Sequence, residues 1–393
     1  MEVIQLLRDL ATRLEEVKAG DVKEVKLLKG WLEQGGFGTL TAPVDAYLDA
    51  KLKVPEKVPA LLTRYYNYIK GPVKVTVDAS KTYDKKIVLL GDRHIRNRDR
   101  CSTDAKATTI DIVDFLRDAI LTADDTVDLF VETKYLRPFS SERQGRGDNF
   151  LGDVDREFDA CLKIDKSRCM YNNARVHYAD IRFAIDESFS EMHYATDAVD
   201  RAGAYDLDAK LKHLEYVLTA IHPTLSKRLA DEKAIRVWFD ESLDRPRIEK
   251  QIRNVPDKGI RDALNKFFAD EIARYAAPYT FTPLTYSALL DAVKRKDKAT
   301  ISKAYKLLFE ISIAYMDVYL LARMFRTFRQ VKNKPSGPPK NILVYVGNYH
   351  AENYRRFLKT LNFDRQFEAA ETRVIQCVDI STLALPLFPN IKL

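Results

Sequence analysis

The spacing of hydrophobic positions changes twice along the chain, and the first stretch has a helical period. Between residues 1 and 30 apolar residues recur three or four positions apart, at Val3, Leu7, Leu10, Leu14 and Val17, which predicts one apolar stripe along a helix. This stripe either docks on the chain's own core or forms a short coiled-coil dimer. Glycines and prolines interrupt residues 35–72 and leave room for short helices at most. We therefore expect an N-terminal helical segment over residues 1–72.

From residue 73 the period becomes that of β-strands. Short apolar runs occur at residues 73–77, 87–90, 127–131, 176–179, 342–346 and 374–380, and most are typical of strands buried on both faces. Helical patterns at 108–121 and 354–361 separate several of these runs, as in βαβ units. The pattern predicts an α/β fold with a mostly parallel central sheet of about six strands flanked by helices.

Between residues 183 and 335 the strand patterns stop and helical periods dominate. Helices are expected over 208–221, 225–240, 259–275, 284–294 and 299–330, with prolines at several of the breaks. Strand and helix patterns resume after the Ser-Gly-Pro-Pro linker at 336–339. We interpret residues 73–182 plus 336–393 as one discontinuous α/β core and residues 183–335 as a large helical insertion.

Composition excludes several classes of protein. The chain has 393 residues, of which 46% are hydrophobic, and a net charge of +7; this small excess, without a recognisable binding motif, argues against a nucleic-acid partner. No apolar run reaches the roughly 18 residues of a membrane helix, and the N-terminal residues are too charged for a signal peptide. A cytoplasmic protein without membrane contact is expected. The four cysteines form no Cys-x-x-Cys pair; reduced thiols are the default expectation, with a disulfide or redox pair as the alternative.

Two strands end in the same motif, a glycine followed three residues later by a histidine. The motifs are Gly91–His94 and Gly347–His350; glycine permits a sharp turn at the strand exit, and the histidine follows at the edge of the sheet. Glu132 and Asp180 each follow directly after another apolar run. Because carboxyl ends of parallel strands meet at one edge, we expect the two histidines and two carboxylates to converge on one crevice.

Two histidines and a glutamate suit two kinds of chemistry. His94, Glu132 and His350 can bind a divalent ion such as Mn, Zn or Co, or act as general base, general acid and orienting partner around a water molecule. Asp317 lies in an otherwise apolar helix and needs a partner. It orients His350, pairs with an arginine such as Arg323 or Arg137, or forms a structural salt bridge.

Arginines flank the proposed crevice. Arg93 precedes the first histidine directly, and Arg137 follows Glu132 by five residues. A guanidinium binds two oxygens at once, so these side chains favour an anionic substrate or a transition-state oxyanion. Asp180 either belongs to this site or caps a turn and pairs with Arg182.

The two Gly-x-x-His motifs together with Glu132 resemble the superfamily that contains TIKI proteases, TraB, ChaN and erythromycin esterases. The matching residues are Gly91 and His94, Glu132, and Gly347 and His350, and Arg137 is similar to an arginine that follows the family glutamate. The resemblance covers about 85–182 and 341–360 and implies a parallel α/β core with a helical insertion and a hydrolytic centre, metal-dependent in some members. Family members usually carry a glutamate within the first motif, where this chain has Asp92 followed by Arg93.

The resulting expectation is a hydrolase that cleaves an ester or amide bond with water activated by His94, His350 and Glu132, directly or through a divalent ion. Arg93 or Arg137 would stabilise the oxyanion. Residues 316–325 are similar to uncharacterised proteins of large DNA viruses. The alternative is therefore a non-catalytic structural or interaction protein on the same fold, such as a virion component. Expected partners are an anionic substrate, a second copy of the chain, or virion assembly partners.

Overall fold

The computed structural model describes the greater part of the chain outside the N-terminal segment. The described residues are 66–94, 101, 109–123, 125–134, 149–162, 169, 171, 173–181, 187–221, 244–276, 284–329, 336–371 and 376–388. The predicted helices at 1–30 and 225–240, and all but the last residues of the predicted segment 1–72, lie outside them.

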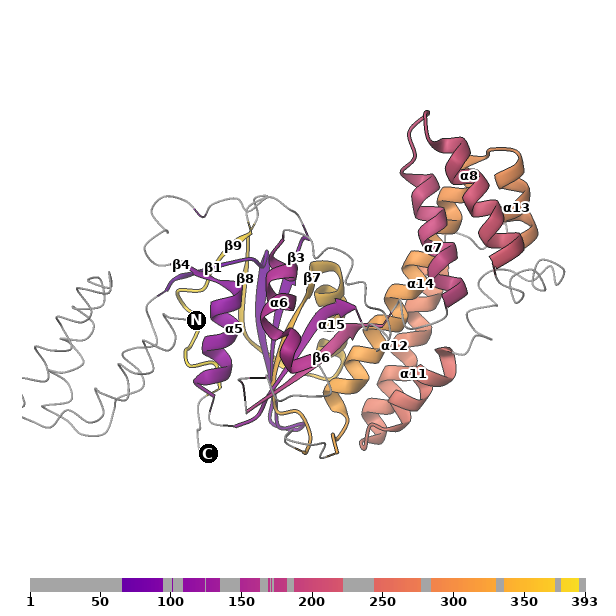
Figure 1. Ribbon diagram of the computed structural model, residues 1–393. Helices are drawn as coiled ribbons and strands as arrows, with labels where there is room; N and C mark the ends of the chain where they lie inside the picture. Colours follow the sequence, from indigo (N-terminus) through magenta and orange to yellow (C-terminus); the bar gives the residue numbers. More distant parts are fainter. Residues whose placement is uncertain are drawn as a thin grey trace, which may run out of the picture.

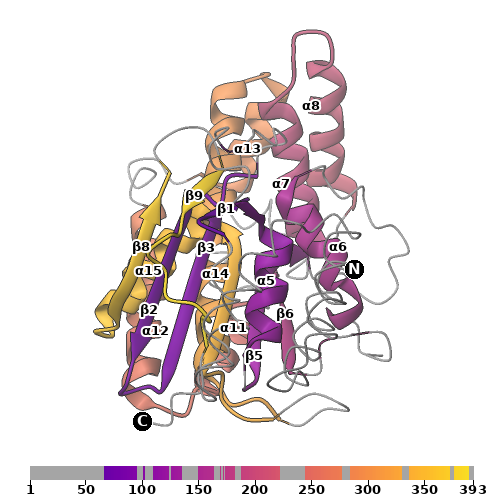
Figure 2. The ribbon, with the colours of Figure 1, turned by 90° about the vertical axis from the view of Figure 1, so that its left-hand side faces the viewer.

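A six-stranded sheet forms the centre of the fold, with the order β6-β5-β7-β3-β2-β8. The first four strands in this order run parallel, whereas β2 is antiparallel to both of its neighbours. Figure 2 shows β8 at one edge of the sheet, with β5 and β6 toward the other. The predicted α/β fold with a mostly parallel sheet of about six strands is confirmed. The strands are β2 (Lys74–Ser80), β3 (Lys85–Asp92), β5 (Val127–Lys134), β6 (Ala174–Asp180), β7 (Asn341–Gly347) and β8 (Asp364–Ala370).

Alternate side chains of the central strands enter two separate hydrophobic cores. Ile87 and Leu89 of β3 belong to one core, and Val88 and Leu90 belong to the other, as the two-residue period of a strand requires. One face of the sheet is covered by helices α5 and α6, and the opposite face by α14 and α15 (Figure 1). Burial on both faces explains why these strands are continuous apolar runs. The helices are α5 (Ile112–Leu121), α6 (Phe150–Leu162), α14 (Lys298–Phe325) and α15 (Asn348–Thr360).

One predicted strand belongs to a different sheet. The run expected at 374–380 contains β9, which pairs with β1, and β1 pairs with β4 in a separate three-stranded sheet. The sixth strand of the central sheet is β8, which carries mostly polar residues and alternates between exposed and half-buried positions. It pairs with β2 alone. The strands of the small sheet are β1 (Tyr68–Lys70), β4 (Thr109–Asp111) and β9 (Cys377–Asp379).

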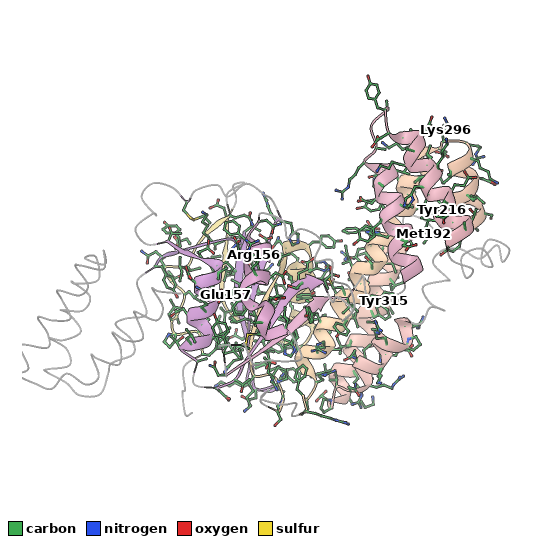
Figure 3. All side chains as sticks on the ribbon, in the orientation of Figure 1. Arg156, Glu157, Met192, Tyr216, Lys296 and Tyr315 are labelled. Atoms are coloured by element: carbon green, nitrogen blue, oxygen red, sulfur yellow. A yellow bond between two sulfur atoms is a disulfide. The ribbon has the colours of Figure 1, made fainter. Side chains whose placement is uncertain are left out.

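Between β6 and β7 the described residues form helices and contribute no strand to either sheet. Helix α14 is buried over most of its length and packs against α7, α11, α12 and α13, and also against α15 beside the sheet. Figure 1 shows α7, α8 and α13 extending away from the sheet, and Figure 3 places Tyr216 and Lys296 in that part. The remaining helices are α7 (Glu187–Asp200), α8 (Leu207–Tyr216), the π-helix η5 (Val217–Ile221), α11 (Asp244–Arg253), α12 (Lys258–Ala276) and α13 (Tyr286–Lys294).

All four cysteines are paired. Cys101 forms a disulfide with Cys377, and Cys161 with Cys169, so the expectation of reduced thiols is wrong. The first disulfide joins residues 276 positions apart in sequence, and sequence spacing alone does not reveal such a long-range partner.

Among the described residues no helix has the length and apolar character needed to cross a membrane.

Candidate active site

The candidate site lies where β3, β5 and β7 end at the same edge of the sheet. Strands β3 and β7 are adjacent and parallel, with Asp92 opposite Gly347, and β5 pairs with the other side of β7. Helix α15 begins at Asn348, directly after Gly347, which places His350 in its first turn. Parallel pairing therefore brings together three chain segments that are far apart in sequence.

The two glycines make this close approach sterically feasible. A Cβ atom on Gly347 would lie 2.6 Å from His94 Nε2 and 3.2 Å from Glu132 Oε2. A Cβ atom on Gly91 would lie within 3.0 Å of several atoms of Asn348. Each glycine thus leaves room for a residue that belongs to the other Gly-x-x-His motif, and this gives a physical reason for the paired motifs.

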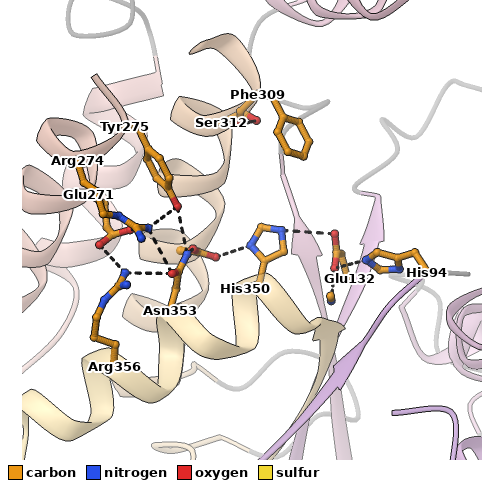
Figure 4. Close-up of polar contacts among 12 residues, drawn as sticks. His94, Glu132, Glu271, Arg274, Tyr275, Phe309, Ser312, His350, Asn353 and Arg356 are labelled. Carbon is orange, nitrogen blue, oxygen red and sulfur yellow. Dashed lines mark hydrogen bonds and ion pairs between the residues drawn. The ribbon is translucent and has the colours of Figure 1, made fainter. Parts of the chain in front are cut away.

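The carboxylate of Glu132 lies between the two imidazole rings (Figure 4). Its Oε2 is 3.3 Å from His94 Nε2, and its Oε1 is 3.6 Å from His350 Nε2. The backbone N–H of Gly347 also donates a hydrogen bond of 2.6 Å to Oε2. Glu132 is buried, so these contacts replace the water that would otherwise solvate its charge.

Asp92 holds His94 from the opposite side. Its Oδ2 accepts a hydrogen bond of 2.9 Å from the backbone N–H of His94 and lies 3.1 Å from the ring Nδ1. His94 has a φ of 56°, a conformation that costs energy in most non-glycine residues and that the bond from Asp92 helps to hold. Partial burial lowers the pKa of His94, but hydrogen bonds to Asp92 and Glu132 outweigh it and raise the pKa to about 10. His94 is therefore an imidazolium at neutral pH.

Gln376 fixes Asp92 in turn. Its side-chain amide donates hydrogen bonds to Asp92 Oδ1 and to the backbone carbonyl of Gly71. The neighbouring residue, Cys377, forms the disulfide with Cys101. The disulfide therefore holds the short segment that positions the first carboxylate of the site.

Asp317 of α14 holds His350 in the corresponding way. Its Oδ1 lies 2.6 Å from His350 Nδ1, and its Oδ2 accepts a hydrogen bond of 2.6 Å from Asn353 Nδ2. Asn353 also donates to the hydroxyl of Tyr275 on α12 at 3.3 Å. Of the alternatives for Asp317, the structure shows the contact of its carboxylate with His350. Figure 4 shows the series of side-chain contacts that runs from Tyr275 to His94.

The two histidines differ in their access to solvent. The side chain of His94 is 39% exposed, whereas those of Glu132 and His350 are each 6% exposed. A molecule in solution therefore reaches His94 first, and the Glu132–His350 pair lies behind it. Arg93, which precedes His94 in the sequence, is also exposed.

The binding of a divalent ion by His94, Glu132 and His350 stays a prediction. Among the described residues, no group of three or more His, Cys, Asp or Glu side chains is arranged to hold one ion. His94 and His350 approach different oxygens of Glu132. The raised pKa of His94 adds a cost, because an imidazole must lose its proton before it binds a metal.

The other predicted site residues have different positions. Asp180 is buried at the end of β6, separated from β7 by β5. Arg137 and Arg182 lie outside the described residues. His177 packs between two aromatic rings and bonds to Asp128, near the start of β5 and away from the Glu132 edge.

Four positioning residues had no signal strong enough to identify them in the sequence. Asp92 differs from the family motif, Gln376 lies in the run expected at 374–380, and Tyr275 lies at the end of the helix expected at 259–275. Those patterns predict the elements but not the contacts of these side chains. Asn353 follows His350 by three residues on a helix, a spacing that places both on one face.

The comparisons with known proteins leave the site to be judged by its geometry. No protein-family model, no curated protein and no solved structure matches this chain.

Proposed function

We propose that the chain is a hydrolase that cleaves an ester or amide bond by acid–base chemistry. The observation that supports this most is the buried Glu132 carboxylate held between two imidazoles, each fixed by its own aspartate. Such pairs of titratable groups in different surroundings are typical of catalytic sites. The similarity of the two Gly-x-x-His motifs to a hydrolase superfamily supports the same reaction class.

His350 is the general base in this proposal. With its Nδ1–H directed to Asp317, the neutral ring has its lone pair on Nε2, which faces Glu132. The 3.6 Å separation from Glu132 Oε1 exceeds a direct hydrogen bond, and a water about 2.8 Å from both atoms would bridge them. His350 takes a proton from this water while the oxygen of the water attacks the carbonyl carbon of the substrate. His350 then returns the proton to the leaving group.

His94 stabilises the developing negative charge. As an imidazolium on the solvent-facing side of Glu132, it is placed to donate to the oxyanion of the tetrahedral intermediate when the substrate displaces its contact with Glu132. Arg93 at the opening favours a substrate with a negative charge of its own. Arg137, which follows Glu132 by five residues in the sequence, is the second candidate for this role.

The helices between β6 and β7 have a catalytic purpose in this proposal. We interpret residues 183–335 as an insertion into the α/β core, because β7 continues the parallel sheet after it. Asp317 comes from this part of the chain and reaches His350 from outside the sheet. The insertion therefore supplies the group that orients the base.

The test is a hydrolysis assay on a panel of anionic and neutral esters and amides, with His350→Gln and Glu132→Gln compared with the wild type. The matched control is His213→Gln, which changes an exposed histidine on α8. We expect turnover by the wild type and the control, and a loss of at least about 10²-fold in both site variants.

The same assay separates the competing proposals. Turnover that survives dialysis against a chelator supports the metal-free mechanism. Activity that appears only after Mn, Zn or Co is restored supports the metal-dependent form, with His94, Glu132 and His350 moving to meet the ion. No turnover on any substrate by folded protein favours the non-catalytic alternative, a structural or interaction protein such as a virion component.

A further inference from the structure

A second cluster of charged groups lies at the opposite end of β5 and β6 from the candidate active site. Asp128 near the start of β5 receives two hydrogen bonds from the guanidinium of Arg175, at 2.8 and 2.6 Å. The same carboxylate lies 2.7 Å from His177 Nε2. All three side chains are buried, and Asp128 is therefore committed to Arg175 and His177.

Two more arginines from the end of α14 complete the cluster. Arg323 lies 2.9 Å from His177 Nδ1 through its Nη2, and Arg326 donates to Gln251 at 2.8 Å. The guanidinium carbon of Arg323 lies 5.1 Å from the centre of the Phe328 ring, and that of Arg326 lies 4.5 Å from it. The guanidinium carbon of Arg175 lies 4.9 Å from the same ring centre. Three guanidinium groups thus surround one aromatic ring.

The positive charge of this cluster is not balanced. Within the described part of the chain no ion pair joins a carboxylate to Arg323 or Arg326, and Asp128 neutralises only one of the three arginines. The segment that follows, residues 327–340, contains four Lys or Arg residues and no Asp or Glu, and of these Lys340 pairs with Asp84. The carbonyl end of α14 offsets about half of one positive charge. The three arginines, one aspartate and this helix end together leave an excess of more than one positive charge.

Each of the two arginines also has an unused donor. The Nε atoms of Arg323 and Arg326 are buried and have no hydrogen-bond partner, a costly state for a charged group. Burial, together with the neighbouring Arg323, lowers the pKa of Arg326 to about 10. Both arginines are half-buried, and an anion bound to the accessible side of their guanidinium groups would offset the repulsion between them.

We propose that Arg323 and Arg326 form a binding site for a small oxyanion of the phosphate class, separate from the candidate active site. Guanidinium groups recognise such oxygens through paired N–H donors. Phe328 is packed against His177 and bridged to Gly337, so it provides a fixed surface that holds the two arginines near each other.

The experiment titrates inorganic phosphate into the full chain at constant ionic strength, with chloride as the replaced anion, and measures heat of binding and thermal unfolding. The variant is Arg326→Gln, and the matched control is Arg201→Gln, an exposed arginine that directly follows the distant helix α7 and pairs with Asp197. We expect saturable binding and a rise in Tm for the wild type and the control. In Arg326→Gln the affinity should fall about tenfold or more, as the loss of a charge-assisted hydrogen bond implies.

A second readout keeps the proposal testable if Arg326→Gln changes stability. Without phosphate, this variant should unfold at the same temperature as the wild type or higher, because it removes a like charge from the cluster. Absence of saturable binding by the wild type overturns the proposal, and so does equal phosphate affinity in wild type and Arg326→Gln. A variant that is destabilised without phosphate and still binds it normally assigns Arg326 a purely structural role.

Discussion

Replacing Gly347 with alanine tests whether the close packing of the two motifs sets the geometry of the site. The backbone at Gly347 has a φ of −52°, which alanine adopts without strain. The new Cβ would lie 2.6 Å from His94 Nε2, about 0.9 Å inside an ordinary contact of about 3.5 Å. His94 has to retreat by nearly that amount, and its partly exposed ring leaves room toward solvent.

Two consequences follow from this displacement. A shift of about 1 Å in a catalytic group lowers the rate about 10²-fold, so hydrolysis by Gly347→Ala should fall by that factor. The His94–Glu132 contact lengthens, so the pKa of His94 should decrease from about 10 toward that of a free histidine. The cost in unfolding free energy should stay below about 1–2 kcal/mol, because the atom that meets the Cβ belongs to a movable side chain.

Histidine ring signals in NMR spectra, followed over a pH titration, measure the second effect without any substrate. The chain has six histidines, and the signal of His94 is assigned by its absence in His94→Gln. Gly203→Ala is the matched control, since its Cβ would have Asp206 as its nearest contact, at 3.9 Å. A His94 pKa that is the same in Gly347→Ala, Gly203→Ala and the wild type would refute the steric argument.

Three further predictions concern the orienting carboxylate, the buried histidine and the long-range disulfide. Asp317→Asn removes the charged acceptor of His350 Nδ1–H, and kcat should fall by about 10³–10⁴-fold with an unchanged circular dichroism spectrum, as in Asp–His pairs of serine hydrolases; unchanged kcat contradicts the role. Burial, aided by Arg323, lowers the pKa of His177 to about 3, so the folded state stays neutral while an unfolded histidine gains a proton below about pH 6.5. The unfolding free energy measured in urea should therefore decrease as the pH falls from 6.5 to 3. This decrease should be about 1.4 kcal/mol per pH unit smaller in His177→Gln than in the wild type; equal slopes in the two proteins exclude this assignment. Peptide mapping without reductant should recover Cys101 linked to Cys377, and reduction should cost up to about 5 kcal/mol of unfolding free energy; free thiols in the untreated protein would argue against the pairing.

The central strands could be predicted because burial on both faces of the sheet requires short runs of mostly apolar residues, which are visible in the local sequence. Ile87–Leu90 of β3 and Ile342–Val346 of β7 are apolar at consecutive positions, and the runs of β5 and β6 are interrupted only by the buried Asp128 and His177, since neighbouring side chains enter different cores. Strand β8 carries no such signal, because it pairs with β2 alone and alternates between exposed and half-buried side chains. Local patterns also do not record which sheet a strand joins, and β9 was therefore assigned to the wrong one.

The residues of the candidate site also fall into those that a local sequence pattern indicates and those that it does not. His94 and His350 follow strand ends closely, Glu132 lies two residues before the last residue of β5, and the geometry of a parallel sheet brings these positions together. The groups that orient them come from elsewhere: Asp317 lies on a helix outside the sheet, and Gln376 lies in a segment held by a disulfide. Their roles depend on contacts across more than 30 residues of sequence, which no local period encodes.

The paired glycines connect these two levels. A glycine at a strand exit is usually explained by its backbone freedom, but Gly347 has an ordinary φ, so conformation gives no reason for it. The reason is the space that a side chain would occupy: Gly347 leaves room for His94 and Glu132, and Gly91 leaves room for Asn348. Each motif is thus shaped by the other. A chain with alanine at Gly347 would keep its strands, since β3 and β7 remain buried, and lose the close contact between Glu132 and His94.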